Sequence, residues 1–153
     1  MFEEKVYEFL DEIVKVAPMF KKNFIESLGF IKEGQLSNHQ YFCLSIIAMQ
    51  EPVSMSILAE GLNVSKQQLT RVVDDLVALG LIERCVDPND RRIILAKLSR
   101  KGEKYIAKLK ATAKERTASL LKIVSAEEFE EAIRCLKNLS DFYEKTKNIE
   151  SEE

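Results

Sequence analysis

Apolar residues recur at steps of three and four along most of this chain, which is the spacing of an amphipathic helix. The first such stripe lies in residues 2–16, and a further apolar set follows near Pro18, where we expect the helix to be interrupted. Only three prolines and five glycines occur among the 153 residues, so the pattern predicts a mainly helical protein.

Three helices are predicted in the middle of the chain, each preceded by a serine suited to cap its first turn. They are residues 38–50 after Ser37, residues 55–61 after Ser54, and residues 66–79 after Ser65. The first and the third have a glutamine three residues after the serine, which completes a capping box. Gly80 stands where the C-terminal cap of the third helix belongs.

Two strands are predicted next, in the runs "LIERCV" and "RIILAKL". The turn between them, residues 87–90, begins Asp-Pro, which favours a type I turn because Pro presets φ and Asp can bond its own backbone. Residues 53–54 can add a very short strand. Two long helices follow, one over about residues 100–122 after Ser99 and one after Ser125.

A short helix, a tight connection, a second helix and a two-stranded hairpin follow one another in this order, which is typical of a winged helix-turn-helix. The predicted fold is therefore mainly α with a small β-hairpin wing. Its elements come in the order two helices, a short strand, two helices, two strands around the wing, and two final helices.

The helix over residues 66–79 is the candidate recognition helix, because such a helix contacts bases with its first turn and packs its opposite face on the core. Its first turns hold side chains suited to base edges: Gln for adenine, Arg or Lys for guanine, and Thr for the thymine methyl group. The candidates are Ser65, Lys66, Gln67, Gln68, Thr70 and Arg71. An exposed polar helix face without a partner has a similar composition, so this helix alone does not decide the function.

The hairpin tip favours DNA more specifically. A long cationic side chain at a narrow tip can enter the minor groove, where negative potential is concentrated. Arg91 and Arg92 are placed for this, and Asp90 can hold one of the two guanidinium groups in a fork. Together with Asn89 these residues form the candidate DNA-binding wing.

Candidate phosphate contacts lie at helix starts. Arg100 and Lys101 begin the helix after the hairpin, and backbone N–H groups near Ser37, Ser54 and Ser65 point out of helix N-termini. Contacts of this kind position a protein on DNA and carry no base information.

The charge distribution agrees with a polyanion partner for the middle of the chain. The formal net charge is only -2, yet residues 62–124 carry fourteen basic and seven acidic side chains. Residues 1–16 have a net charge of -3 and residues 125–153 a net charge of -5. Such a split suits DNA binding by the centre, although solvated helix faces without a partner remain the alternative.

Other classes of protein find little support. No apolar run approaches the roughly 20 residues that span a bilayer, and the acidic amphipathic N-terminus is no signal peptide, so we expect a cytoplasmic protein without a membrane partner. The chain has one histidine, no glycine-rich phosphate loop and no GxSxG motif. We therefore expect no enzyme, no metal site and no cofactor.

The three cysteines, Cys43, Cys85 and Cys135, are too few and too far apart for a disulfide framework or a CxxC site. Small buried hydrophobes are the simpler interpretation. A thiol that senses oxidation remains an alternative, since reactivity depends on a lowered pKa that composition does not reveal.

Residues 52–102 resemble the multiple-antibiotic-resistance-regulator (MarR) family of bacterial repressors. The resemblance rests on "LAEGLNVS" before the recognition helix, "VVDDLVALGLIER" from its second half onward, "DPNDRR" at the wing and "LSRKG" at the start of the next helix. It implies that Arg92 is the minor-groove arginine and that Asp90 orients it. Many family wings carry a basic residue where this chain has Asn89, which leaves Arg91 as the substitute.

The resemblance also implies a triangular homodimer on double-stranded operator DNA, in which each winged domain, residues 35–102, reads half of a pseudo-palindrome. Residues 1–34 and 103–150 would form the dimerisation region. The apolar stripes of the terminal helices support this independently, because a lone winged domain could not cover them. Their dimerisation residues are Phe2, Val6, Phe9, Leu10, Ile13, Ile133, Leu136, Leu139, Phe142 and Tyr143.

Family members often release DNA when a small aromatic or lipophilic effector binds between the two regions, and repression is the family's usual mode. The candidate pocket residues are Met19, Phe20, Phe24, His39, Phe42 and Met49, though such residues also suit plain core. Some members respond instead to a cysteine near the start of the first helix, where this chain has none. A winged helix used only for contact with proteins is a further alternative, but it would not require the two wing arginines.

Overall fold

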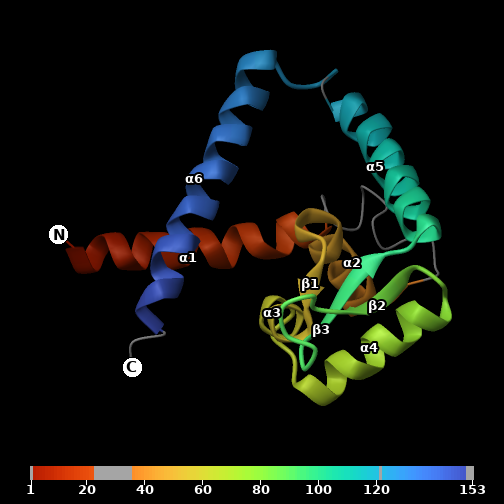
Figure 1. The fold of residues 1–153 in the computed structure, drawn as a ribbon. Coiled ribbons are helices and arrows are strands. Elements are labelled where there is room, and N and C mark those ends of the chain that lie inside the picture. Colours follow the sequence, from red (N-terminus) through yellow and green to blue (C-terminus); the bar gives the residue numbers. More distant parts are fainter. Residues whose placement is uncertain (1, 23–35, 121, 151–153) are drawn as a thin grey trace. The chain divides into compact units, whose positions relative to one another are not determined.

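A computed structural model describes residues 2–22, 36–120 and 122–150. The chain divides into two compact units, Met1–Ala113 and Lys114–Glu153. The predicted order of elements is confirmed (Figure 1). The elements are α1 (Phe2–Phe20), α2 (Asn38–Gln50), β1 (Val53–Ser54), α3 (Met55–Gly61), α4 (Lys66–Ala78), β2 (Ile82–Val86), β3 (Ile94–Leu98), α5 (Arg100–Leu120) and α6 (Ala126–Glu150).

Serine caps begin the helices as predicted. In α2 and α4 the serine Oγ accepts from the backbone N–H three residues on, and the glutamine at that position accepts the serine N–H, so both capping boxes are complete. Ser54 caps α3 through the N–H of Ile57, at 3.3 Å. These local bonds satisfy donors that a helix leaves unpaired, which is why each helix begins where it does.

A small antiparallel sheet, in the order β1-β3-β2, joins the helices. β3 begins at Ile94 rather than at Arg92, where the apolar run "RIILAKL" begins. The reason is local: the N–H of Arg92 donates to Oδ1 of Asp90, at 3.0 Å, instead of to β2. The wing is consequently a longer loop, which the bond from Asp87 N–H to the Ile93 carbonyl closes.

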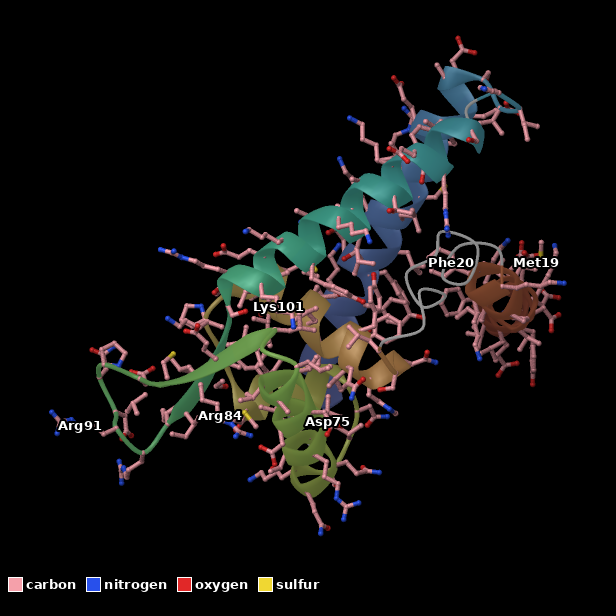
Figure 2. All side chains as sticks on the ribbon, turned by 90° about the vertical axis from the view of Figure 1, so that its right-hand side faces the viewer. Met19, Phe20, Asp75, Arg84, Arg91 and Lys101 are labelled. Atoms are coloured by element: carbon pink, nitrogen blue, oxygen red, sulfur yellow. The ribbon has the colours of Figure 1, made fainter. Side chains whose placement is uncertain are left out.

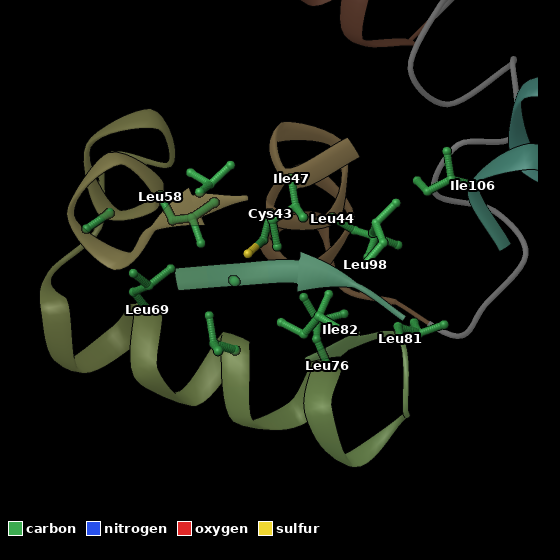
Figure 3. Packing of buried hydrophobic residues seen from close by; sticks show 14 of the residues in the cluster. Cys43, Leu44, Ile47, Leu58, Leu69, Leu76, Leu81, Ile82, Leu98 and Ile106 are labelled. Carbon is green, nitrogen blue, oxygen red and sulfur yellow. The ribbon is translucent and has the colours of Figure 1, made fainter. Parts of the chain in front are cut away.

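The core of the winged helix-turn-helix lies where α2, α3 and α4 meet the sheet (Figure 3). Every one of these elements contributes aliphatic side chains to it, and the first turns of α5 add Ile106 and Leu109. On α4 the residues Leu69, Val73 and Leu76 are buried, whereas Val77 and Leu79 at its end are exposed although they belong to the same apolar stripe. The buried face of α4 thereby determines which of its side chains face outward.

The junction of α4, β2 and α5 is closely packed. Gly80 has φ +69°, a conformation that suits glycine, and it lets Leu81 N–H bond to the Leu76 carbonyl at the end of α4. Gly102 lies in the first turn of α5, where an added Cβ would be 2.0 Å from the carbonyl oxygen of Leu81. Only glycine fits there without a shift of backbone.

The expected interruption near Pro18 is wrong, because α1 continues to Phe20. A proline in a helix removes one backbone donor and crowds the carbonyl four residues earlier. Pro18 therefore costs α1 the bond to the Val14 carbonyl, and the helix continues through Pro18 to Phe20 in spite of this loss. None of the helices in the described part of the chain is both long and apolar enough to cross a membrane.

Candidate nucleic-acid interface

The N-terminal half of α4 presents a continuous polar face. Leu69 and Val73 are buried and Val72 is half-buried against the core, so Thr70 and Arg71 and the residues before Leu69 face outward. The predicted recognition residues Ser65, Lys66, Gln67, Gln68, Thr70 and Arg71 are all exposed. The fold thus brings the predicted set together on one surface.

Two of these side chains are engaged within the helix. The amide oxygen of Gln68 accepts from the N–H and from the hydroxyl of Ser65, at 3.0 and 3.1 Å. The hydroxyl of Thr70 donates to the Lys66 carbonyl, at 2.9 Å. A bidentate contact with adenine needs both the oxygen and the nitrogen of an amide, so Gln67 suits that contact better than Gln68.

The wing carries the predicted fork. Nε of Arg92 donates to Oδ1 of Asp90 and Nη2 donates to Oδ2, both at 3.1 Å. The Arg92 side chain is 91% exposed and that of Asp90 35%, so the carboxylate sits at the base while the guanidinium stands in solvent. The hydrogen bonds from Arg92 hold the pKa of the Asp90 carboxyl below its ordinary value. The carboxylate is therefore charged at neutral pH, and its two hydrogen bonds restrict the orientation of the guanidinium group.

The tip of the wing is ordered by a second carboxylate. Oδ1 of Asp87 accepts the backbone N–H groups of Asn89 and Asp90, at 2.7 and 3.2 Å. This is the local Asp contact that the sequence predicts for the first turn position. Arg91 extends away from the wing (Figure 2), and Asn89 is also exposed.

The side chains predicted to contact phosphates differ in exposure and in whether they already make a bond within the protein. Nζ of Lys101 donates to the Leu79 carbonyl, at 2.7 Å, and so caps the end of α4. Arg100 beside it is exposed, as is Ser37 at the start of α2, and Ser54 is half-buried at the start of α3. The ammonium group of Lys101 thus makes one structural bond, in addition to any contact that it would make with DNA.

Two hydrogen bonds attach α4 to its neighbours, and neither is visible in the sequence. Nη2 of Arg84 on β2 donates to Oδ1 of Asp74, at 2.5 Å, and Nε2 of Gln40 on α2 donates to Oδ2 of Asp75, at 3.0 Å. The helical period places both carboxylates outward, but their partners lie 10 and 35 residues away. Only the fold brings these pairs together.

The predicted pocket residues do not gather at one place in the described chain. A concavity of about 240 Å³ lies between α2 and α5, and Met49 is the predicted residue that lines it, beside Tyr41, Ile106 and Leu109. Met19, Phe20, His39 and Phe42 are exposed elsewhere on α1 and α2. Phe24 lies outside the described residues.

Most of the dimerisation candidates are exposed in the described part of the chain. The side chains at these positions on α1 and α6 are exposed or half-buried: Val6, Phe9, Leu10, Ile13, Ile133, Leu136, Leu139, Phe142 and Tyr143. The side chain of Phe2 lies outside the described set. Both helices thus keep apolar stripes that their own unit does not bury.

Cys43 is buried in the core, where desolvation raises the pKa of its thiol to about 12. Cys85 on β2 is half-buried and Cys135 on α6 is exposed. Within the described residues no three His, Cys, Asp or Glu side chains lie close enough together to hold a metal ion. Because its thiol is buried and the pKa of that thiol is raised, Cys43 is expected to behave as a core side chain rather than as a nucleophile.

Comparisons with known proteins agree with this geometry. The family model described as "MarR family" matches residues 35–93. The transcriptional regulator BldR from Sulfolobus solfataricus is 26% identical, with a TM-score of 0.64 over 88% of this chain and 97% of that one. A MarR family protein from Bacillus stearothermophilus, 22% identical, superposes with a TM-score of 0.74 over 94% and 98% of the two chains. RV1404 from Mycobacterium tuberculosis, 23% identical, gives 0.73 over 89% and 92%.

A capped helix with an outward polar face beside a β-hairpin wing defines the winged helix-turn-helix fold of DNA-binding transcriptional regulators. The predicted resemblance to the MarR family is confirmed, and the match to the family model covers residues 35–93.

Proposed function

We propose that this protein is a homodimeric, sequence-specific DNA-binding regulator that represses transcription. The proposal rests on one observation, which is that the wing and α4 both expose side chains suited to contact DNA. The wing holds Arg92 in a fork with Asp90, and α4 presents Lys66, Gln67 and Arg71 on its exposed face.

The two elements suit different grooves. An α-helix fits the major groove, where each base pair has a distinct pattern of donors and acceptors, so α4 would supply direct readout. The wing guanidinium suits the minor groove, which it would recognise by width and potential. Arg100 and the N–H groups at the starts of α2 and α3 would contact phosphates and fix the register.

A dimer follows from the apolar stripes on α1 and α6. Exposed aliphatic and aromatic residues at helical spacing are unfavourable in water, and a second copy would remove them from it. We assign residues 1–34 and 103–150 to this region and residues 35–102 to the DNA-binding domain. A two-fold dimer would place its recognition helices about 34 Å apart, which suits a pseudo-palindromic operator.

The test is to select binding sites from random duplexes and to measure binding to the selected site, and to the DNA beside the protein's own gene, by fluorescence anisotropy. A specific complex should form with a Kd of about 10⁻⁸ M or tighter at physiological salt. Its affinity should fall steeply as salt rises, because phosphate contacts release counterions.

Equal affinity for the selected site and for a scrambled duplex would contradict the proposal. Binding without salt dependence would instead favour a winged helix used for contact with proteins. In vitro transcription from a template with the selected site over a promoter then tests repression, and increased transcript would contradict that part alone.

The concavity between α2 and α5 suits a small aromatic or lipophilic effector. Its walls are mainly aliphatic and aromatic, and Lys110 at its edge suits an anionic group. Such a molecule would release DNA only if it bound one arrangement of the dimer better than the other, typically by about 1–3 kcal/mol. Titration of aromatic carboxylates into the protein–DNA complex tests this, with Met49→Lys as the variant that should not respond.

A further inference from the structure

The recognition helix α4 carries two adjacent carboxylates, Asp74 and Asp75, in a part of the chain where basic side chains outnumber acidic ones. Three physical effects oppose them there. Aspartate is a poor former of helix interiors, negative charge is unfavourable in the C-terminal half of a helix, and a carboxylate near DNA is repelled by phosphates. A contact made by these side chains must offset these costs.

Asp74 connects α4 to the wing. Its Oδ1 accepts from Nη2 of Arg84, at 2.5 Å, and the two side chains are 55% and 37% exposed. Arg84 lies on β2, the strand that leads to the wing, and pairs across the sheet with Ala96 of β3. The ion pair therefore joins the helix that would read the major groove to the hairpin that would read the minor groove.

Asp75 connects α4 to the start of α2. Its Oδ2 accepts from Nε2 of Gln40, at 3.0 Å. The amide oxygen of the same Gln40 accepts the N–H of Ser37, at 2.8 Å, as part of the capping box of α2. Because one side chain makes both bonds, the position of α4 is tied to the position of the first turn of α2.

We infer that Asp74 and Asp75 are positioning residues, which hold the recognition helix in a set orientation to the wing and to α2 and so contribute to sequence specificity through Arg84 and Gln40. The inference rests on the proposed DNA-binding function. Simultaneous readout in two grooves requires a defined distance and angle between helix and wing. Two bonds that involve a carboxylate leave α4 about 100° apart around its axis, one to β2 and one to α2, and would restrict that angle in addition to the apolar core.

The inference predicts two effects, one on the affinity for any duplex and the other on the preference for the selected site. Loss of a carboxylate removes repulsion, so affinity for any duplex rises. Loss of the link loosens the geometry, so the preference for the selected site falls. The informative quantity is therefore the specificity ratio, the affinity for the selected site divided by the affinity for a scrambled duplex of equal length at the same salt.

The experiment compares Asp74→Ala, Arg84→Ala and the double variant in a double-mutant cycle. Each single variant should lower the specificity ratio on the order of tenfold, and the double variant should lower it no further, because one link is lost in all three. Alanine favours a helix more than aspartate does, so Asp74→Ala should not destabilise α4. A role of Asp74 in helix stability alone would therefore predict no loss of the specificity ratio. Circular dichroism and thermal unfolding verify that each variant is folded.

Asp75 is tested by a pair of variants that separates charge from hydrogen bonding. Asp75→Asn keeps an acceptor for Gln40 and should keep the specificity ratio, whereas Asp75→Ala should lower it. The matched control is Glu83→Ala, which breaks the 3.4 Å ion pair between Glu83 of β2 and Lys97 of β3 and removes a carboxylate that makes no bond to α4 in the described part of the chain. Its specificity ratio should equal that of the wild type.

Specific binding by the wild type together with unchanged ratios in the variants would overturn this inference and leave the proposed function intact. Additive losses in the cycle, or equal losses in Glu83→Ala, would also overturn it, since they would indicate a general effect of charge. Absence of specific binding by the wild type would overturn the proposed function and this inference with it.

Discussion

At the scale of the residue, the wing is organised by bonds between neighbours in the chain. Asp87 orders the turn, and Asp90 binds both the backbone and the guanidinium of Arg92, two residues later. Such short-range bonds depend little on the rest of the fold, which explains why the sequence predicts the fork of Asp90 with an arginine. The same spacing leaves Arg91 extended and without that carboxylate.

The wing assignment predicts unequal roles for the two arginines. Arg92→Ala should weaken binding to the selected site by about 1–3 kcal/mol, with the larger loss on A·T-rich flanks, because an oriented guanidinium in a narrow minor groove is lost. Competition anisotropy with flanks of different composition measures this.

The control is Arg91→Ala, which removes the same charge from the adjacent position. It should weaken binding to all duplexes alike and reduce the salt dependence. If the two variants were indistinguishable on every flank, the Asp90–Arg92 fork would have no part in readout.

The burial of Cys43 leads to a second prediction at the scale of the residue, which concerns the reactivity of its thiol. With a pKa near 12, its thiol is almost entirely protonated at pH 8 and is also shielded from reagent. A variant that keeps only Cys43, with Cys85→Ser and Cys135→Ser, should react with a disulfide reagent only after denaturant is added, as followed by absorbance.

The comparison variant, Cys43→Ser with Cys135→Ser, keeps the half-buried Cys85 and should react in the folded protein. Rapid reaction of Cys43 without denaturant would instead revive a sensing role for this cysteine.

At the scale of the element, the end of α4 and the start of α5 are joined by contacts at close range. Lys101 caps α4, the hydroxyl of Ser99 donates to the Gly80 carbonyl at 2.6 Å, and its Oγ accepts the Gly102 N–H at 3.0 Å. These bonds fix where α5 leaves the sheet. The capping role of Ser99 is predictable from sequence, but its second bond, to Gly80, depends on how β3 returns to the end of α4.

The packing of Gly102 predicts a strong effect of one methyl group. Gly102→Ala should destabilise the protein by about 1–3 kcal/mol, since its Cβ would meet the Leu81 carbonyl oxygen at 2.0 Å and the backbone would have to move. Urea unfolding followed by circular dichroism measures the change in the free energy of unfolding.

Lys104→Ala is the control on the exposed side of the same helix, and it should change stability by less than about 0.5 kcal/mol. A Gly102→Ala variant as stable as the wild type would mean that α5 can shift freely at this junction.

At the scale of the whole molecule, we propose a division of the chain between association, through the apolar stripes of the acidic helices α1 and α6, and DNA binding, through the basic winged domain. The predicted division rests on amphipathic period and charge. How far the association region extends along α5 is less evident in the sequence, because Ile106, Leu109 and Ala113 are buried in the first unit.

The proposed dimer predicts sensitivity to charge on the apolar face of α6. Leu136→Glu should raise the dimer dissociation constant at least about tenfold, because burying an unpaired carboxylate costs several kcal/mol. Sedimentation equilibrium over a range of concentrations measures this.

Lys137→Glu, one residue away on the polar face of α6, changes charge more strongly but should leave the dimer intact. Equal association of the wild type and Leu136→Glu would exclude this face from the interface.

The sequence by itself determined the elements, the helix caps and the wing fork, because each depends on periodicity or on bonds between residues close in the chain. It did not determine that Pro18 leaves α1 continuous, since a proline removes one helical bond but does not have to end the helix. It also did not reveal the links Asp74–Arg84 and Gln40–Asp75 or the tight fit of Gly102. Those contacts join side chains or backbone from separate elements, and only the packing of the core brings such groups within bonding distance.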